Sequence, residues 1–186
     1  VIDCISEENA ELGLHPGSGS QRPVMRNNIA RNNGTDGLFL CWRVRHGLFE
    51  NNRLENNGRF GISIGHKDSD NLLRANQVTG NAESGIFFRV ESAPMAPHRN
   101  RLEANVIEDN GRAPGTAGIR IRGEVSDLTF ERNQIRDTRS ADARTQTIGI
   151  LVEPHVGPVN LDANQIEAET VVQDQREHPT KTATPK

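Results

Sequence analysis

Gly61-Ile62-Ser63-Ile64-Gly65-His66-Lys67-Asp68-Ser69-Asp70-Asn71 combines a short strand signal with a polar turn. Ile62 and Ile64 alternate with Ser63, which is typical of a strand with one buried face. The same opening, a glycine followed by apolar residues at its second and fourth positions, recurs at Gly37, Gly85, Gly118 and Gly149, with a degenerate copy at Gly13. The first of these glycines are spaced 24 residues apart. A fixed period in this range predicts stacked structural repeats.

The composition agrees with a stack of thin repeats. Only 33% of the 186 residues are hydrophobic, and the mean hydropathy is -0.66. Such values suit a solenoid, in which each repeat contributes a few inward side chains and long polar turns. The net charge of -3 argues against a nucleic-acid binder held by bulk charge. No apolar run is long enough for a membrane helix, and no signal peptide is visible.

Asparagine recurs in step with the apolar residues. Counted from the leading glycine, with insertions removed, the sixteenth position is asparagine in all six coils: Asn28, Asn52, Asn76, Asn105, Asn133 and Asn164. A partial second series contains Asn33, Asn57, Asn81 and Asn110. Asparagine disfavours helix interiors, tolerates left-handed turns and can bond to an identical amide one strand spacing away. The pattern predicts three short strands per coil, separated by asparagine-containing turns.

These repeated Asn-x-(Leu/Ile/Val) and Gly-Ile-x-Ile phrases resemble right-handed parallel β-helix repeat proteins of the pectate-lyase-like superfamily, over about residues 13–172. The resemblance implies an all-β, right-handed parallel β-helix of about six 24-residue coils. We assign residues 1–172 to this domain, which could be the C-terminal part of a longer solenoid, and residues 173–186 to a disordered polar tail. The superfamily contains polysaccharide lyases, glycoside hydrolases, epimerases and proteins without assigned activity. It implies an extracellular or periplasmic location.

Three insertions interrupt the repeat, around 93–97, within 111–117 and within 138–147. Insertions on one face of a solenoid often shape a binding site, and they also arise by neutral drift. Both interpretations are open at this level.

Chemically capable residues gather after the first strand of successive coils. We expect them to share one outer ridge, because equivalent positions stack in a solenoid. An aromatic platform beside ionic groups suits sugar binding. The predicted substrate-binding residues are Phe39, Trp42, Arg43, Arg45, Phe87, Arg89, Arg120 and Arg122. The predicted catalytic residues are His66, Lys67, Asp68, Glu91 and Glu124.

Several chemistries fit this ridge. A lyase or epimerase of uronic acids would use an arginine to neutralise the carboxylate and His66 or Lys67 to remove the neighbouring proton. A glycoside hydrolase would instead use a carboxylate pair such as Glu91 and Glu124, about 5.5 Å apart or more. No cofactor is predicted, although Asp68 and Asp70 carry the oxygen ligands that Ca²⁺ prefers. The same run is also ordinary turn composition, and the whole ridge could be a solvated salt-bridge ladder.

The sequence therefore predicts a β-helix that binds an acidic polysaccharide through its first-strand ridge and cleaves or epimerises it. A non-catalytic structural or surface-binding module is the alternative, and a glycoside hydrolase is a further one. The first coil should expose an apolar cross-section and unpaired strand edges. We therefore expect self-association or an additional domain at the N-terminal end of the stack.

Overall fold

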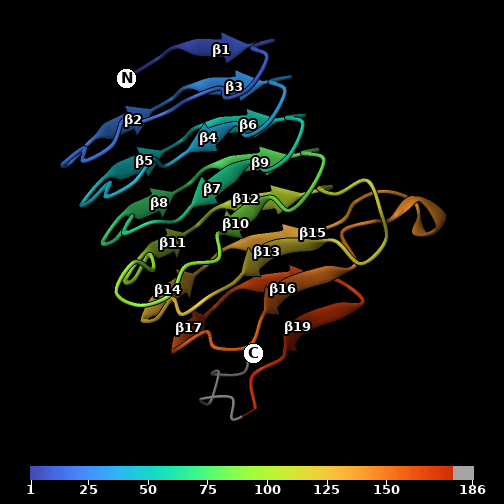
Figure 1. Ribbon diagram of the computed structural model, residues 1–186. Coiled ribbons are helices and arrows are strands. Elements are labelled where there is room, and N and C mark those ends of the chain that lie inside the picture. The colour runs from blue at the N-terminus through green and yellow to red at the C-terminus, as the bar shows by residue number, and fades with distance from the viewer. Residues whose placement is uncertain (178–186) are drawn as a thin grey trace.

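A computed structural model describes residues 1–177 as a stack of coils built from three parallel sheets (Figure 1). The first-strand sheet contains β4 (Leu38–Phe39), β7 (Ile62–Ile64), β10 (Ile86–Phe88), β13 (Ala117–Ile121), β16 (Ile148–Val152) and β19 (Thr170–Asp174). The second-strand sheet contains β2 (Val24–Arg26), β5 (Leu48–Glu50), β8 (Leu72–Arg74), β11 (Arg101–Glu103), β14 (Leu128–Glu131) and β17 (Val159–Asp162). The third-strand sheet contains β1 (Ile5–Glu7), β3 (Ile29–Arg31), β6 (Arg53–Glu55), β9 (Gln77–Thr79), β12 (Val106–Glu108), β15 (Gln134–Arg136) and β18 (Gln165–Glu167). The predicted parallel β-helix is confirmed.

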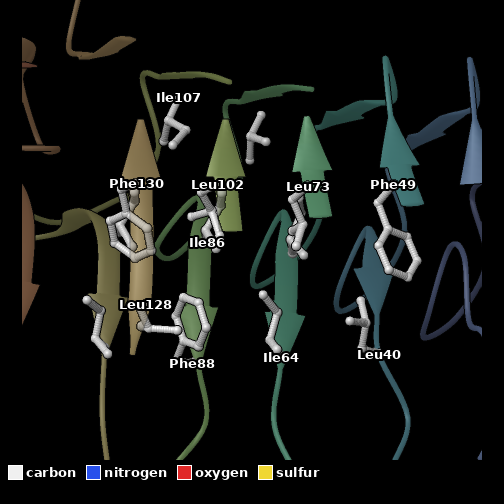
Figure 2. Close-up of a cluster of buried hydrophobic side chains, with 14 of the residues drawn as sticks. Leu40, Phe49, Ile64, Leu73, Ile86, Phe88, Leu102, Ile107, Leu128 and Phe130 are labelled. Atoms are coloured by element: carbon white, nitrogen blue, oxygen red, sulfur yellow. The ribbon is translucent and has the colours of Figure 1, made fainter. Parts of the chain in front are cut away.

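The core is a set of inward columns that run along the stack. Phe49, Leu73, Leu102 and Phe130 occupy equivalent positions of four successive strands, and each is completely buried. Figure 2 shows these side chains side by side, facing the column that includes Ile64 and Phe88 of the first-strand sheet. Because a strand has only one inward face, a few large apolar residues per coil are enough to fill the interior.

The asparagine series lies inside one turn, as predicted. Each Nδ2 in the series up to Asn133 donates to the Oδ1 of the next asparagine, at 2.9–3.0 Å. The same Oδ1 also accepts the backbone N–H of the previous asparagine, for example from Asn52 to Asn76 at 3.0 Å. The second series is a ladder too, and Gln146 continues it above Asn110. The sequence analysis missed a third, shorter ladder, in which Asn71 bonds to Asn100 at 3.1 Å.

The coil length is not uniform. Consecutive ladder asparagines are 24 residues apart in the first coils and 28 to 31 apart from Asn76 onward. The single 3₁₀ helix of residues 1–177, η1 (Ala141–Ala143), lies in the third insertion. The predicted insertions account for the longer coils, because they lengthen the turns without disturbing the strand register.

Two further predictions concern the ends of the stack. Strand β19 runs to Asp174, so residues 173 and 174 belong to the first-strand sheet rather than to the predicted tail. Residues 178–186 lie outside the described part of the chain. At the other end, the apolar side chains of Val1, Ile2 and Ile5 are exposed. Within residues 1–177 no helix is long and apolar enough to cross a membrane.

Candidate functional site

The outward face of the first-strand sheet collects many of the residues predicted from the sequence. Strand register stacks Phe39, Ser63, Phe87, Arg120 and Leu151 in one outward column. The turns that follow the same strands carry Trp42, His66, Glu91, Arg122 and Glu124 along the C-terminal edge of the sheet. We call this column and this edge the first-strand ridge.

Arg89 lies at the centre of the ridge, yet its guanidinium is largely used within the protein. Nη1 donates to Oγ of Ser63 at 2.9 Å, and Nη2 donates to the carbonyl oxygen of Leu40 at 2.8 Å. Nη2 also donates to Oδ2 of Asp68 at 3.1 Å. The guanidinium lies over the ring of Phe39, 4.2 Å from its centroid. Arg89 therefore ties three neighbouring coils together. Because these bonds occupy its guanidinium, little of it is left for the substrate carboxylate that it was predicted to bind.

Asp68 is likewise a buried structural acid. Its Oδ1 accepts the N–H of Val44 at 3.0 Å, and its Oδ2 accepts that of Gly65 at 2.9 Å. Burial raises the pKa of Asp68 to about 6, against the lowering effect of these amides and of Arg89. Gly65 is required here, because a Cβ at this position would lie 2.3 Å from Nε of Arg89. Asp68 is 0% exposed, so its carboxylate does not reach a substrate on the ridge surface as its predicted catalytic role requires.

Trp42 is the most prominent exposed group of the ridge. Its side chain is 52% exposed, and its indole lies 5.1 Å from the imidazole of His66 at a tilt of 37°. Nδ1 of His66 is in turn 3.6 Å from Oε2 of Glu91. Trp42 and Arg43 both have left-handed backbone conformations, with φ of 49° and 66°. The same conformation recurs in turns along the stack, for example at Asn27, Asn51 and Lys67, so it belongs to the coil geometry.

Arg43 and Lys67, the two cations in the turns around Trp42 and His66, differ in whether their charged groups have partners in the protein. Arg43 donates from Nη2 to Oγ of Ser18 at 2.9 Å. Lys67 uses its backbone N–H to bond Met95, whereas its ammonium has no hydrogen bond or ion pair within residues 1–177. The Lys67 side chain is therefore available to an anionic ligand next to Trp42 and His66.

Three further residues predicted for the site, Arg120, Arg122 and Glu124, form ion pairs or hydrogen bonds within the protein. Arg120 and Arg122 both bind Glu153, and Arg122 Nε donates at 2.8 Å. Burial by itself would raise the pKa of Glu153, but hydrogen bonds from these two arginines hold it below its usual value. Glu124 accepts the backbone N–H of Ala93 at 2.7 Å and so fastens the first insertion.

Arg45 lies away from the centre of the ridge. The hydrogen bond from Arg99 is the main reason that the pKa of Asp70 is lowered, and the charge of Arg45 adds a smaller effect. Arg99 binds both carboxylate oxygens of Asp70, at 2.6 and 2.9 Å. Because Asp68 and Asp70 are engaged in this way, the oxygen atoms that the calcium hypothesis needs already have partners. Within residues 1–177 no three His, Cys, Asp or Glu side chains converge as metal ligands.

The structure also brings in residues that the sequence analysis did not select. Phe60 stacks on Phe87 with ring centroids 4.1 Å apart and extends the aromatic column. Arg112 and Ser84 line a pocket beside Arg120. The insertion within 111–117 was the only sequence signal for this pocket, because Ser84 lies in a turn that matches the regular repeat.

Fold and site together define a parallel β-helix with a polar and aromatic ridge on its first-strand sheet. The chain belongs to the family described as "Periplasmic copper-binding protein (NosD)", whose model matches residues 6–150. A search of the curated proteins finds no match.

Solved structures with the same fold include three alginate-modifying enzymes. The A-module of the Azotobacter vinelandii mannuronan C-5 epimerase AlgE4 has a TM-score of 0.72 and 22% identity, over 86% of this chain and 39% of that one. For the A-module of AlgE6 from the same organism, the TM-score is 0.68 and the identity 15%, over 95% and 51%. For the periplasmic alginate epimerase AlgG, the TM-score is 0.62 and the identity 14%, over 92% and 42%. At these identities the likeness is one of fold, and the chain spans about half or less of each structure.

The family description implies copper, and the donor set does not fit it. Copper favours imidazole, thiolate and thioether ligands. Both cysteines are free, Cys4 bonds the carbonyl oxygen of Ile2, and Met25 is buried in the core. Within residues 1–177 no three His, Cys, Asp or Glu side chains come together, so the residues present do not form a copper site of these ligands.

Proposed function

We propose that the protein binds an acidic polysaccharide along the first-strand ridge. The observation that carries this proposal is the exposed Trp42, which packs against His66. Lys67 follows His66 in the chain, and its ammonium has no partner within residues 1–177. An indole offers its face to the apolar side of a sugar ring, and a neighbouring cation attracts a uronate carboxylate. The family description supports a periplasmic location.

Energetic cost supports a binding role for Trp42. Trp42 is 52% exposed, which leaves a large apolar area in water. His66 is the only ring that packs against the indole within residues 1–177. A ligand that stacks on the ring would supply the missing contact.

The ridge also supports proton transfer to and from such a polymer. His66, oriented by Glu91, lies beside Lys67, and this pair offers the base and the acid that removal and return of a proton next to a carboxylate require. Return of the proton to the opposite face of the carbon would epimerise the sugar, and departure of the adjoining glycosidic oxygen would instead cleave the chain. The fold shared with mannuronan and alginate epimerases supports this candidate reaction. A hydrolytic carboxylate pair is less well supported, because Glu91 faces His66 and Glu124 holds the amide of Ala93.

Calorimetric titration of oligomannuronate and oligogalacturonate, with an uncharged oligoglucan as reference, tests the binding proposal. We expect the wild type to bind an acidic oligomer, and Trp42→Ala to bind it about ten-fold or more weakly. Val24→Ala, which trims an exposed apolar side chain on the second-strand sheet, is the matched control and should bind normally. No heat from any acidic oligomer, or equal affinity of wild type and Trp42→Ala, would overturn the proposal.

The reaction is tested by following the same oligomers in time, by NMR for epimerised residues and by absorbance for unsaturated ends. Under this mechanism His66→Ala loses turnover but still binds the oligomer, and Lys67→Ala loses turnover and binds more weakly. Glu124→Gln, which leaves His66, Lys67 and Glu91 in place, is inactivating only under the hydrolase alternative. Binding without any product in the wild type would identify a non-catalytic binding module.

A further inference from the structure

A second concave site lies at the opposite, N-terminal edge of the first-strand sheet. It is a pocket of about 280 Å³ between the turn before β10 and the insertion before β13. Its wall includes Glu83 and Ser84 from the turn and Arg112 from the insertion. Arg120 and Leu151, from the outward column of the ridge, complete it. The pocket is therefore continuous with the proposed binding surface.

Three polar side chains of this pocket lack partners in the protein. Ser84 is only 4% exposed, but its hydroxyl is open to the pocket and forms no hydrogen bond within residues 1–177. The guanidinium of Arg112 has no hydrogen bond or ion pair with the same residues, and the carboxylate of Glu83 forms no hydrogen bond with them. These three groups are therefore open to a ligand in the pocket: a hydroxyl, a guanidinium and a carboxylate, each able to form a hydrogen bond.

The pocket wall is pre-organised by the next insertion. Thr147 accepts the N–H of Gly115 at 3.0 Å, and the hydroxyl of Thr145 donates to Gly111 at 2.7 Å. Arg139 donates to the carbonyl oxygens of Asn110 and Gly111. Two insertions from consecutive coils thus brace one another at a single edge of the sheet. A rigid wall lowers the entropy lost when a ligand binds.

The third insertion is itself fixed by a buried acid, Asp137. Asp137 binds Arg139 and accepts the backbone N–H groups of Thr145 and Gln146 at 3.0 and 2.9 Å. Burial opposes ionisation, but these hydrogen bonds hold the pKa of Asp137 well below its usual value. The carboxylate is therefore ionised and holds the loop at neutral pH.

We propose that this pocket binds one uronate unit, with its carboxylate on Arg112 and its hydroxyls on Ser84 and Glu83. The volume lies at the lower limit of ligand pockets, about 300 Å³, and suits a single sugar ring rather than a chain. The pocket wall carries two arginines, Arg112 and Arg120, and one carboxylate, Glu83. Arg120 is paired with Glu153, so Arg112 is the cation available to a ligand. This inference rests on the proposed function. It adds a subsite that selects a carboxylate-bearing sugar and that lies further along the stack than Trp42.

Titration of D-glucuronate, followed by the NMR shifts of the pocket residues, tests the subsite without any polymer. The wild type should bind glucuronate more tightly than glucose, and Arg112→Gln should bind glucuronate about ten-fold or more weakly. Ala113→Trp, which fills the pocket from an exposed loop position, should abolish the binding. Arg53→Gln, in the third-strand sheet, is the matched control and should have no effect.

The Trp42→Ala variant separates this inference from the proposed function. It should retain glucuronate binding in the pocket while binding the polymer more weakly. The subsite alone would be overturned if Trp42→Ala lost polymer binding as expected but Arg112→Gln or Ala113→Trp bound glucuronate as tightly as the wild type. Equal binding of glucuronate and glucose, or no binding of glucuronate, would overturn it as well.

Discussion

Asp68 and Arg89 form an ion pair in which each partner also binds the backbone of neighbouring turns. Asp68 accepts two amide N–H groups, and Arg89 donates to the carbonyl oxygen of Leu40. Removal of either partner would leave buried polar groups without bonds, which is usually more costly than the net value of the pair. The pair therefore fixes the turn that presents His66 and Lys67.

The raised pKa of Asp68 has a consequence for stability. The folded protein holds this proton up to about pH 6, whereas the unfolded chain releases it near 3.8, the ordinary pKa of an aspartate. The stabilising contribution of the protonated acid is therefore complete below about pH 4 and is lost as the pH rises through 6. We expect the difference in unfolding free energy between wild type and Asp68→Asn to shift by about 2–3 kcal/mol across this window.

Urea unfolding of both proteins at a series of pH values measures this difference. Asp70→Asn is the control of opposite sign, because the hydrogen bond from Arg99 lowers the pKa of Asp70. The contribution of ionised Asp70 to the free energy of unfolding is present above its pKa in the unfolded chain. It is lost as the pH falls through its lower pKa in the folded protein. A difference for Asp68→Asn that is constant, or that grows with rising pH, would contradict the assigned environment.

Between elements, the asparagine ladder joins each coil to the next. Asn76 donates to Phe49 and Asn105, and its Oδ1 accepts both the backbone and the side-chain N–H of Asn52. Since all these groups are buried, a side chain that cannot bond to them leaves several of them unsatisfied.

Asn76→Leu should lower the free energy of unfolding by about 2–4 kcal/mol, as measured by urea denaturation. Asn160→Leu, at an exposed position of β17, is the matched control and should change it by less than about 0.5 kcal/mol. Equal stability of the two variants would show that the ladder contributes nothing beyond strand pairing.

At the scale of the molecule, the stack exposes β1 as an edge strand together with the side chains of Ile2 and Ile5. Ile5 is 61% exposed. An unpaired edge with apolar side chains favours pairing with another strand.

We expect the 186-residue chain to self-associate through this end. Sedimentation velocity should show a concentration-dependent increase in mass for the wild type and a smaller one for Ile5→Lys. Val171→Lys, near the other end of the stack, is the control for a general gain of solubility. A wild type that sediments as a monomer at all concentrations would contradict this prediction.

Much of the architecture could be predicted from residue spacing. Asn28 and Asn52 repeat with the apolar positions around them, and the structure stacks them as expected. The candidate site was less predictable. Trp42 and His66 were selected by residue type and do meet, whereas Arg89 and Asp68 were selected on the same grounds and bind one another. Residue type and repeat position alone do not distinguish a free ion from one that binds a neighbouring coil.

The sequence by itself determined the coil, the inward columns and the ladders, because each depends on a local pattern that repeats and stacks on its own copy. The tertiary structure alone decided which ridge residues remain free and where the insertions meet. Arg89 reaches the carbonyl oxygen of Leu40, 49 residues away, and Gly115 reaches Thr147, 32 residues away. Such contacts depend on how turns of different lengths fit against one another across coils, and no periodic pattern encodes that fit.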